Sequence, residues 1–208
     1  MKNLSFLIVI LLLFFTGCNK KDATTNQTSQ TTTQQQSNTG VSSSDKSTAQ
    51  GLTIPYVLKF DKAPNQKAAA NFSWEQNGKT VSLSDFKGRV ILLNIWAQWC
   101  GPCKQEMPYL SQIYDEYKDK GLVIIGVSID KANDRAKLES YLQSNPVSYL
   151  IVHDVKGDIL KTYPAPDGSD MINVFPTTFI IDKKGEIVES FVGSKTKEAF
   201  ISYIKKYL

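Results

Sequence analysis

The sequence contains little cysteine or histidine and no long basic run. Its 208 residues include three cysteines and one histidine, and no more than two basic residues stand side by side. The formal net charge is only +4, with Lys interspersed among Asp and Glu. Because proteins that bind nucleic acid usually carry a clustered basic patch, we exclude a nucleic-acid partner.

Aromatic side chains are missing between Phe15 and Tyr56. Within that gap, residues 24–50 are almost all Ser, Thr, Asn or Gln, and such a stretch cannot bury enough apolar surface to offset the entropy lost on folding. The composition predicts a flexible linker there. The folded part then covers residues 52–208, which is enough for one domain and too short for two.

No apolar stretch reaches the roughly 20 residues that a membrane-spanning helix needs. Residues 4–15 are apolar apart from Ser5 and follow Lys2, which is the pattern of a signal peptide. Residues 15–18 (FTGC) resemble the bacterial lipoprotein cleavage box, although Phe15 stands where Leu is usual. We expect a signal peptide over residues 1–17, a lipidated Cys18 and a linker over residues 18–51. An ordinary signal peptide with an incidental Cys18 is the alternative.

Two nearly continuous apolar runs, residues 90–96 (VILLNIW) and 122–129 (LVIIGVSI), have the pattern of strands buried on both faces. The segment between them repeats apolar residues at helical spacing and ends at Lys120-Gly121. Strand, helix and strand form a βαβ unit, which places the chain in the α/β class.

The remaining patterns complete a mixed sheet flanked by helices, with an N-terminal hairpin extension. Residues 79–83 form a strand after the turn at 76–78, and residues 177–181 and 186–192 form a second hairpin around Gly185. Three further helices and one further strand are predicted, the helices at residues 134–142, 155–163 and 197–207 and the strand at residues 148–152.

The chemistry is expected at residues 99–103 (WCGPC), directly after the first buried strand. Two cysteines separated by two residues at the start of a helix meet unpaired N–H groups and the positive end of the helix dipole, which favour a thiolate. Cys100 falls at or near the N-cap and Pro102 in the first turn, where a missing N–H costs nothing. Cys103 lies within reach of Cys100.

The cysteine pair has two other interpretations. A four-ligand zinc site is disfavoured because Cys18 is assigned to the anchor and His153 lies on a different element. We therefore expect no metal. A purely structural disulfide remains open in an oxidising compartment, although so short a loop constrains the unfolded chain only weakly.

Residues 96–103 (WAQWCGPC) and 175–182 (FPTTFIID) resemble the thioredoxin superfamily, in particular the membrane-anchored TlpA/ResA-like thiol-disulfide oxidoreductases. The resemblance covers about residues 68–208 and implies a thioredoxin-like fold. It also implies that Pro176 is a cis-proline beside the redox pair, whereas a strand-start proline is the alternative. Substrate would then lie along residues from both motifs, namely Trp99, Gly101, Pro102, Phe175, Pro176 and Thr177.

Asn94 departs from thioredoxin, which has a buried Asp at this position as a proton acceptor. The TlpA/ResA-like group often places a buried Glu on the first core hairpin, and Glu75 is the nearest candidate for a catalytic acid. A solvated hairpin glutamate is the alternative. Glu106 and Pro108 also match the family helix, and we interpret Glu106 as a charge favoured by the helix dipole.

The resemblance and the thiol chemistry together predict an extracytoplasmic enzyme that uses no cofactor. Cys100 and Cys103 would reduce disulfides in exported proteins, for example in cytochrome c maturation, and a membrane thiol-electron donor would recharge them. We expect a monomer that faces the periplasm or the cell exterior of a bacterium. A peroxiredoxin-like antioxidant enzyme and a redox-inert thioredoxin-like binding module are the alternatives.

Overall fold

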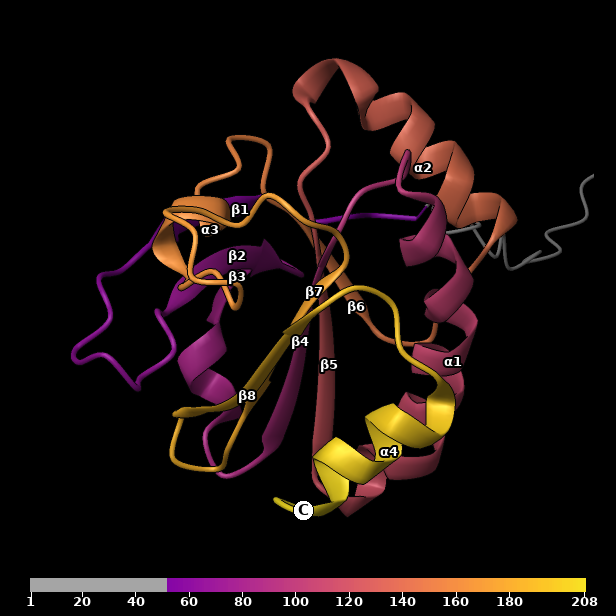
Figure 1. Ribbon diagram of the computed structural model, residues 1–208. Coiled ribbons are helices and arrows are strands. Elements are labelled where there is room, and N and C mark those ends of the chain that lie inside the picture. Colours follow the sequence, from indigo (N-terminus) through magenta and orange to yellow (C-terminus); the bar gives the residue numbers. More distant parts are fainter. Residues whose placement is uncertain (1–51) are drawn as a thin grey trace, which may run out of the picture. The chain divides into compact units, whose positions relative to one another are not determined.

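The computed structural model describes residues 52–208. The predictions for the signal peptide, for Cys18 and for the linker lie outside these residues. Within the described part, no helix combines the length and apolar character needed to cross a membrane. The chain from residue 52 onward forms a five-stranded sheet and a three-stranded sheet with helices around them (Figure 1).

The five-stranded sheet has the order β6-β5-β4-β7-β8. Its parallel half consists of β4 (Val90–Trp96), β5 (Leu122–Ser128) and β6 (Leu150–His153), and its antiparallel half adds β7 (Thr177–Ile181) and β8 (Ile187–Val192). Every residue of β4 and β5 is buried. The continuous apolar runs therefore predicted the two central strands correctly, and the mixed sheet is confirmed.

Three of the helices cover one face of the five-stranded sheet. The apolar residues of α1 (Gly101–Tyr117), α2 (Arg135–Ser144) and α4 (Lys197–Lys205) form one core with Leu92 and Trp96 of β4. A short 3₁₀ helix continues α1, and the chain turns at a left-handed Gly121 (φ 100°) as the sequence predicted. Figure 1 shows α1 and α4 side by side along this face, and the two helices are in contact.

The three-stranded sheet comprises β1 (Val57–Phe60), β2 (Phe72–Gln76) and β3 (Lys79–Ser82). Asn77 and Gly78 join β2 to β3 with positive φ angles of 53° and 72°, as a tight hairpin turn requires. The side chains of Phe72 and Trp74 are fully buried in a second core on the other face of the five-stranded sheet. The predicted hairpin is therefore present, but β1 was not foreseen.

Most remaining helix predictions hold with adjusted ends, whereas the helix predicted over residues 155–163 is reduced to α3 (Ile159–Thr162). Gly157, at φ 67°, and the turn around it occupy the start of that range. The Asp154 carboxylate accepts the Ile159 N–H at 2.8 Å, so α3 begins only after this turn.

Gly126 of β5 lies in a tightly packed part of the α1 face. A Cβ added there would lie 2.6 Å from Ile151 Cδ1 and 3.2 Å from Trp96 Nε1. We predict that Gly126→Ala lowers the free energy of unfolding by about 1–3 kcal/mol, because overpacking forces neighbours to shift. Urea unfolding measures this. Ile151→Val removes the nearest atom, so Gly126→Ala should cost less in that background. Equal costs in both backgrounds would contradict the prediction.

Candidate active site at the start of helix α1

The two cysteines lie where β4 passes into α1. After β4 the chain makes a turn in which the Cys100 N–H donates to the Ala97 carbonyl at 3.0 Å. Cys100 is the N-cap of α1, and Cys103 follows in its first turn. The two form a disulfide, with their Cα atoms 5.3 Å apart. The predicted pairing is therefore present, and it leaves Cys100 5% exposed and Cys103 fully buried.

Cys100 is the better placed of the two to act as a nucleophile. Its Sγ accepts the Cys103 N–H at 3.2 Å, so it already faces a donor at the end of the helix. In the reduced protein the same donor and the positive end of the α1 dipole stabilise a thiolate on Cys100. The buried Cys103 is then the thiol that resolves an intermediate.

A small apolar surface flanks the disulfide and joins the two sequence motifs. The Trp99 side chain is 57% exposed, and its ring meets Phe175 edge-on with the ring centroids 5.8 Å apart. The Phe175–Pro176 peptide is cis, as the resemblance implied. Thr177 Oγ1 donates to the Val174 carbonyl at 2.7 Å, and this bond holds the segment that leads into β7. The structure thus brings these predicted residues together, whereas their contact with substrate stays a prediction.

Glu106 is a buried carboxylate on α1, three residues after Cys103. Its side chain is completely inaccessible to solvent. Oε1 accepts from Asn94 Nδ2 at 2.8 Å, and Oε2 accepts from the Lys195 N–H at 3.3 Å. Asn94 Nδ2 also donates to Thr178 Oγ1 at 3.1 Å. Asn94 of β4 and the backbone that follows β8 therefore bind the two oxygens of this acid, and Thr178 of β7 binds the same Asn94 amide.

Burial governs the acidity of Glu106. Loss of solvation raises its pKa from 4.5 to about 7, although hydrogen bonds from Asn94, Lys195 and Ser194 act in the opposite direction. A carboxyl with this pKa exchanges its proton near neutral pH. Because residues three apart are neighbours on a helix surface, Glu106 and Cys103 lie on the same side of α1.

Glu75 does not take the buried position that the sequence analysis assigned to a catalytic acid. It pairs with Thr80 in the β2–β3 hairpin and its side chain is exposed. Side chains alternate along a strand, and the neighbouring Trp74 fills the core position. We therefore correct the assignment of the buried acid from Glu75 to Glu106.

The sequence pattern placed Glu106 on the helix, but it did not predict that the side chain is buried. The usable signal was its spacing of three from Cys103, combined with the amide of Asn94 in a buried strand. An amide in such a strand needs a hydrogen-bond partner, and Glu106 supplies it.

The loop over residues 163–174 leads from α3 to the cis-proline. Tyr163 Oη donates to the Ala70 carbonyl at 2.7 Å, and the Ile172 N–H donates to the Leu160 carbonyl at 2.8 Å. Tyr163 and Ile172 are also buried in the second core, so the loop is held there at two points. Val174, which is 41% exposed, is the part that adjoins Phe175.

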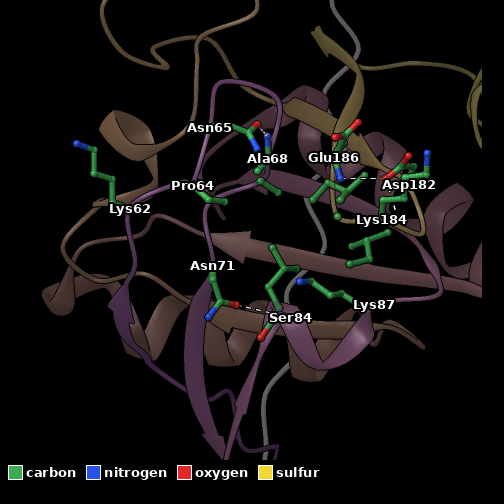
Figure 2. Close-up of a pocket in the computed structure, with 15 residues that line it drawn as sticks. Lys62, Pro64, Asn65, Ala68, Asn71, Ser84, Lys87, Asp182, Lys184 and Glu186 are labelled. Atoms are coloured by element: carbon green, nitrogen blue, oxygen red, sulfur yellow. Dashed lines mark hydrogen bonds between the residues drawn. The ribbon is translucent and has the colours of Figure 1, made fainter.

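A cavity of about 260 Å³ lies at the opposite end of the five-stranded sheet from the disulfide (Figure 2). Ile91, at the start of β4, and Ile181, at the end of β7, are among its apolar lining residues, and Lys62, Lys87 and Lys184 are among its charged ones. None of the described lining residues is a cysteine. The cavity is therefore separate from the redox pair.

A family model and several known proteins match most of this chain. The family model described as Redoxin matches residues 59–207. Thiol-disulfide oxidoreductase ResA of Bacillus cereus is 36% identical over 163 residues, which cover 77% of this chain and 89% of the relative.

Two solved structures with the same fold have names that refer to thiol:disulfide interchange or to thioredoxin. A protein described as thiol:disulfide interchange protein DsbE from Chlorobium tepidum has a TM-score of 0.56 and 32% identity, with coverage of 73% of this chain and 98% of the neighbour. The pneumococcal exposed lipoprotein thioredoxin of Streptococcus pneumoniae has a TM-score of 0.55 and 28% identity, with coverage of 65% and 98%.

The raised pKa of Glu106 predicts a pH-dependent loss of stability. Between pH 4.5 and about 7 the unfolded chain releases this proton while the folded protein keeps it, so the free energy of unfolding falls as the pH rises. Glutamine does not titrate. The free energy of unfolding of Glu106→Gln, relative to wild type, should therefore rise between pH 4.5 and pH 8, by up to about 3 kcal/mol.

Urea unfolding of the oxidised protein at both pH values measures the difference. Glu116→Gln, which changes an exposed glutamate on the same helix, is the matched control. A pH dependence shared equally by both variants would argue against Glu106 as its source.

Proposed function

The chain belongs to the Redoxin family and is a thioredoxin-like thiol-disulfide oxidoreductase, and we propose that it reduces disulfides in exported proteins outside the cytoplasm. The observation that carries the proposal is the Cys100–Cys103 disulfide at the N-terminus of α1, with a helix N–H directed at Cys100 Sγ. The adjoining Trp99–Phe175 surface would receive the substrate chain.

The reaction moves two electrons from the reduced pair to the substrate. The Cys100 thiolate attacks one sulfur of a substrate disulfide, which forms a mixed disulfide and releases the other substrate sulfur as a thiolate. Cys103 then attacks Cys100 Sγ, which frees the second substrate thiol and closes the disulfide seen in the structure. The residues themselves carry the electrons, so this scheme uses no cofactor.

Glu106 is the group we assign to proton exchange with Cys103. The resolving thiol must lose its proton to attack, and its buried position makes water a poor acceptor. Glu106 is buried on the same side of the helix and has a pKa of about 7, so it can accept that proton and release it later. The Asn94 amide donates to Glu106 Oε1 and holds the carboxyl group in place.

The reducing direction is supported by the residues between the cysteines. Gly101 and Pro102 form the dipeptide of thioredoxin, whose disulfide is among the most stable of these pairs toward reduction. A reductase of this kind needs a membrane thiol-electron donor, because no glutathione pool serves it outside the cytoplasm. Substrates of suitable chemistry include an apocytochrome with a haem-binding cysteine pair, a copper-site protein and wrongly oxidised exported proteins.

The extracytoplasmic location is supported by the N-terminal sequence. We propose that residues 1–17 are a signal peptide, that Cys18 carries the lipid anchor, and that residues 18–51 tether a monomeric domain of residues 52–208. The description of a structural relative as an exposed lipoprotein is consistent with this arrangement.

Trapping tests the proposed chemistry. We predict that reduced Cys103→Ala accumulates a mixed disulfide at Cys100 with a disulfide-bonded peptide, because no second thiol is left to release the product. Non-reducing gels and mass spectrometry identify the bond. Cys100→Ala is the matched control and should form little adduct. Faster adduct formation by Cys100→Ala would reverse the roles, and peroxide consumption without any disulfide substrate would favour the peroxiredoxin alternative.

A second experiment tests the anchor. We predict that Cys18→Ala moves the protein from the membrane to the soluble fraction and leaves disulfide reduction unchanged, because Cys18 lies more than thirty residues before the folded domain. Fractionation and a soluble disulfide assay measure the two effects. A Cys18→Ala protein that stays with the membrane would contradict lipid attachment at this residue.

A further inference from the structure

His153 is the only histidine of the chain, and it is fully buried at the end of β6. Its Nδ1 lies 3.1 Å from Nη1 of Arg135, and its Nε2 lies 2.6 Å from the Asp130 carbonyl oxygen. A guanidinium can only donate hydrogen bonds, so Nδ1 must accept. Nε2 then carries the hydrogen and donates to the Asp130 carbonyl.

Asp130 connects this histidine to the turn before the redox pair. Both of its carboxylate oxygens accept the Gln98 N–H, at 3.2 and 3.0 Å. Ser128 Oγ donates to the same carboxylate at 2.8 Å, and Asp130 is completely buried. Gln98 precedes Trp99 and Cys100 in the turn closed by Ala97. Asp130 therefore holds the turn that presents the nucleophile and the exposed tryptophan.

The other side of His153 is held by the segment at which the folded domain begins. The His153 N–H donates to the Pro55 carbonyl at 2.8 Å, and the Tyr56 ring stacks on the imidazole with centroids 5.3 Å apart. Arg135 donates to the Ile54 carbonyl at 2.7 Å and lies 4.5 Å above the Tyr56 ring. The imidazole is thus fixed in position and in tautomer.

We propose that His153 and Asp130 are positioning residues for disulfide reduction. His153 fixes Asp130, Asp130 fixes the Gln98 N–H, and the turn then presents Trp99 and Cys100 to a peptide substrate. Neither the His153–Asp130 contact nor the Asp130–Gln98 contact involves the reacting sulfurs. The inference rests on the proposed use of Cys100 and of the Trp99–Phe175 surface, and it adds residues from β6 and from the end of β5 to that site.

The effect should appear in substrate binding more than in thiol chemistry. His153→Phe keeps the ring stacked on Tyr56 but removes both nitrogen contacts. We expect the KM for a disulfide-bonded peptide to rise about tenfold, because Arg135 and the Asp130 carbonyl both lose a partner, with a smaller change in kcat. Reduction of dithiobis(nitrobenzoate), which is too small to need the Trp99 surface, should lose less kcat/KM than reduction of the peptide does.

Conservative variants separate positioning from general damage. His153→Gln retains a donor for the Asp130 carbonyl and an acceptor for Arg135, so it should restore most of the peptide KM. Asp130→Ala should raise the peptide KM about tenfold, whereas Asp130→Asn keeps an oxygen that can accept the Gln98 N–H and should stay within about threefold of wild type.

Asp182→Ala is the matched control at the far end of the sheet. Asp182 Oδ1 accepts the N–H groups of Lys184 and Glu186, each at 2.9 Å, beside the cavity in Figure 2. This variant also loses carboxylate contacts to backbone N–H groups, but away from the cysteines. Its peptide KM should equal that of wild type.

The kinetics are measured on the full-length chain, with thermal unfolding to confirm folding. Wild-type protein that fails to reduce the peptide would refute the proposed function itself. An active wild type with an unchanged KM in folded His153→Phe and Asp130→Ala would overturn only the positioning inference, as would an equal rise in Asp182→Ala. If His153→Phe does not fold, Asp130→Ala and Asp130→Asn test the inference. If Asp130→Ala does not fold, His153→Phe and His153→Gln test it.

Discussion

The redox centre depends on how the chain passes from β4 into α1. Because β4 is buried on both faces, it delivers the chain to the helix start at a fixed point, and the first N–H groups of a helix have no partner within it. Cys100 takes the N-cap position and its Sγ accepts one of these groups. The Cys103 N–H that donates to Cys100 Sγ in the oxidised protein is therefore the same group that stabilises a Cys100 thiolate after reduction.

Local signals in the sequence were sufficient to predict this junction. The apolar runs in β4 and β5, the helical spacing between them and the glycine at position 121 all act over a few residues, and all are present as expected. β1 is different, because VLKF carries little alternation of its own. It becomes a strand by pairing with β2 across an irregular register, which is a tertiary contact that local patterns do not encode.

The buried polar groups were harder to predict for the same reason. A glutamate near the start of a helix is usually exposed, and the burial of Glu106 depends on Asn94 in β4 and on Lys195, which is 89 residues away. The family resemblance predicted a buried acid but assigned it to Glu75. The surroundings of His153 are also non-local, because its partners come from α2, from the end of β5 and from the segment before β1.

Burial raises the pKa of Glu106, and the neutral amide at position 94 offsets only part of that rise. A lysine or arginine there would offset the cost of burial and hold the pKa of Glu106 low, and an aspartate would place a second negative charge beside it. Asn94 donates a hydrogen bond without a full charge, so the loss of solvation outweighs it and the pKa rises to about 7. The carboxyl therefore stays buried and held in place, yet it can gain or lose its proton at the pH where thiol exchange takes place.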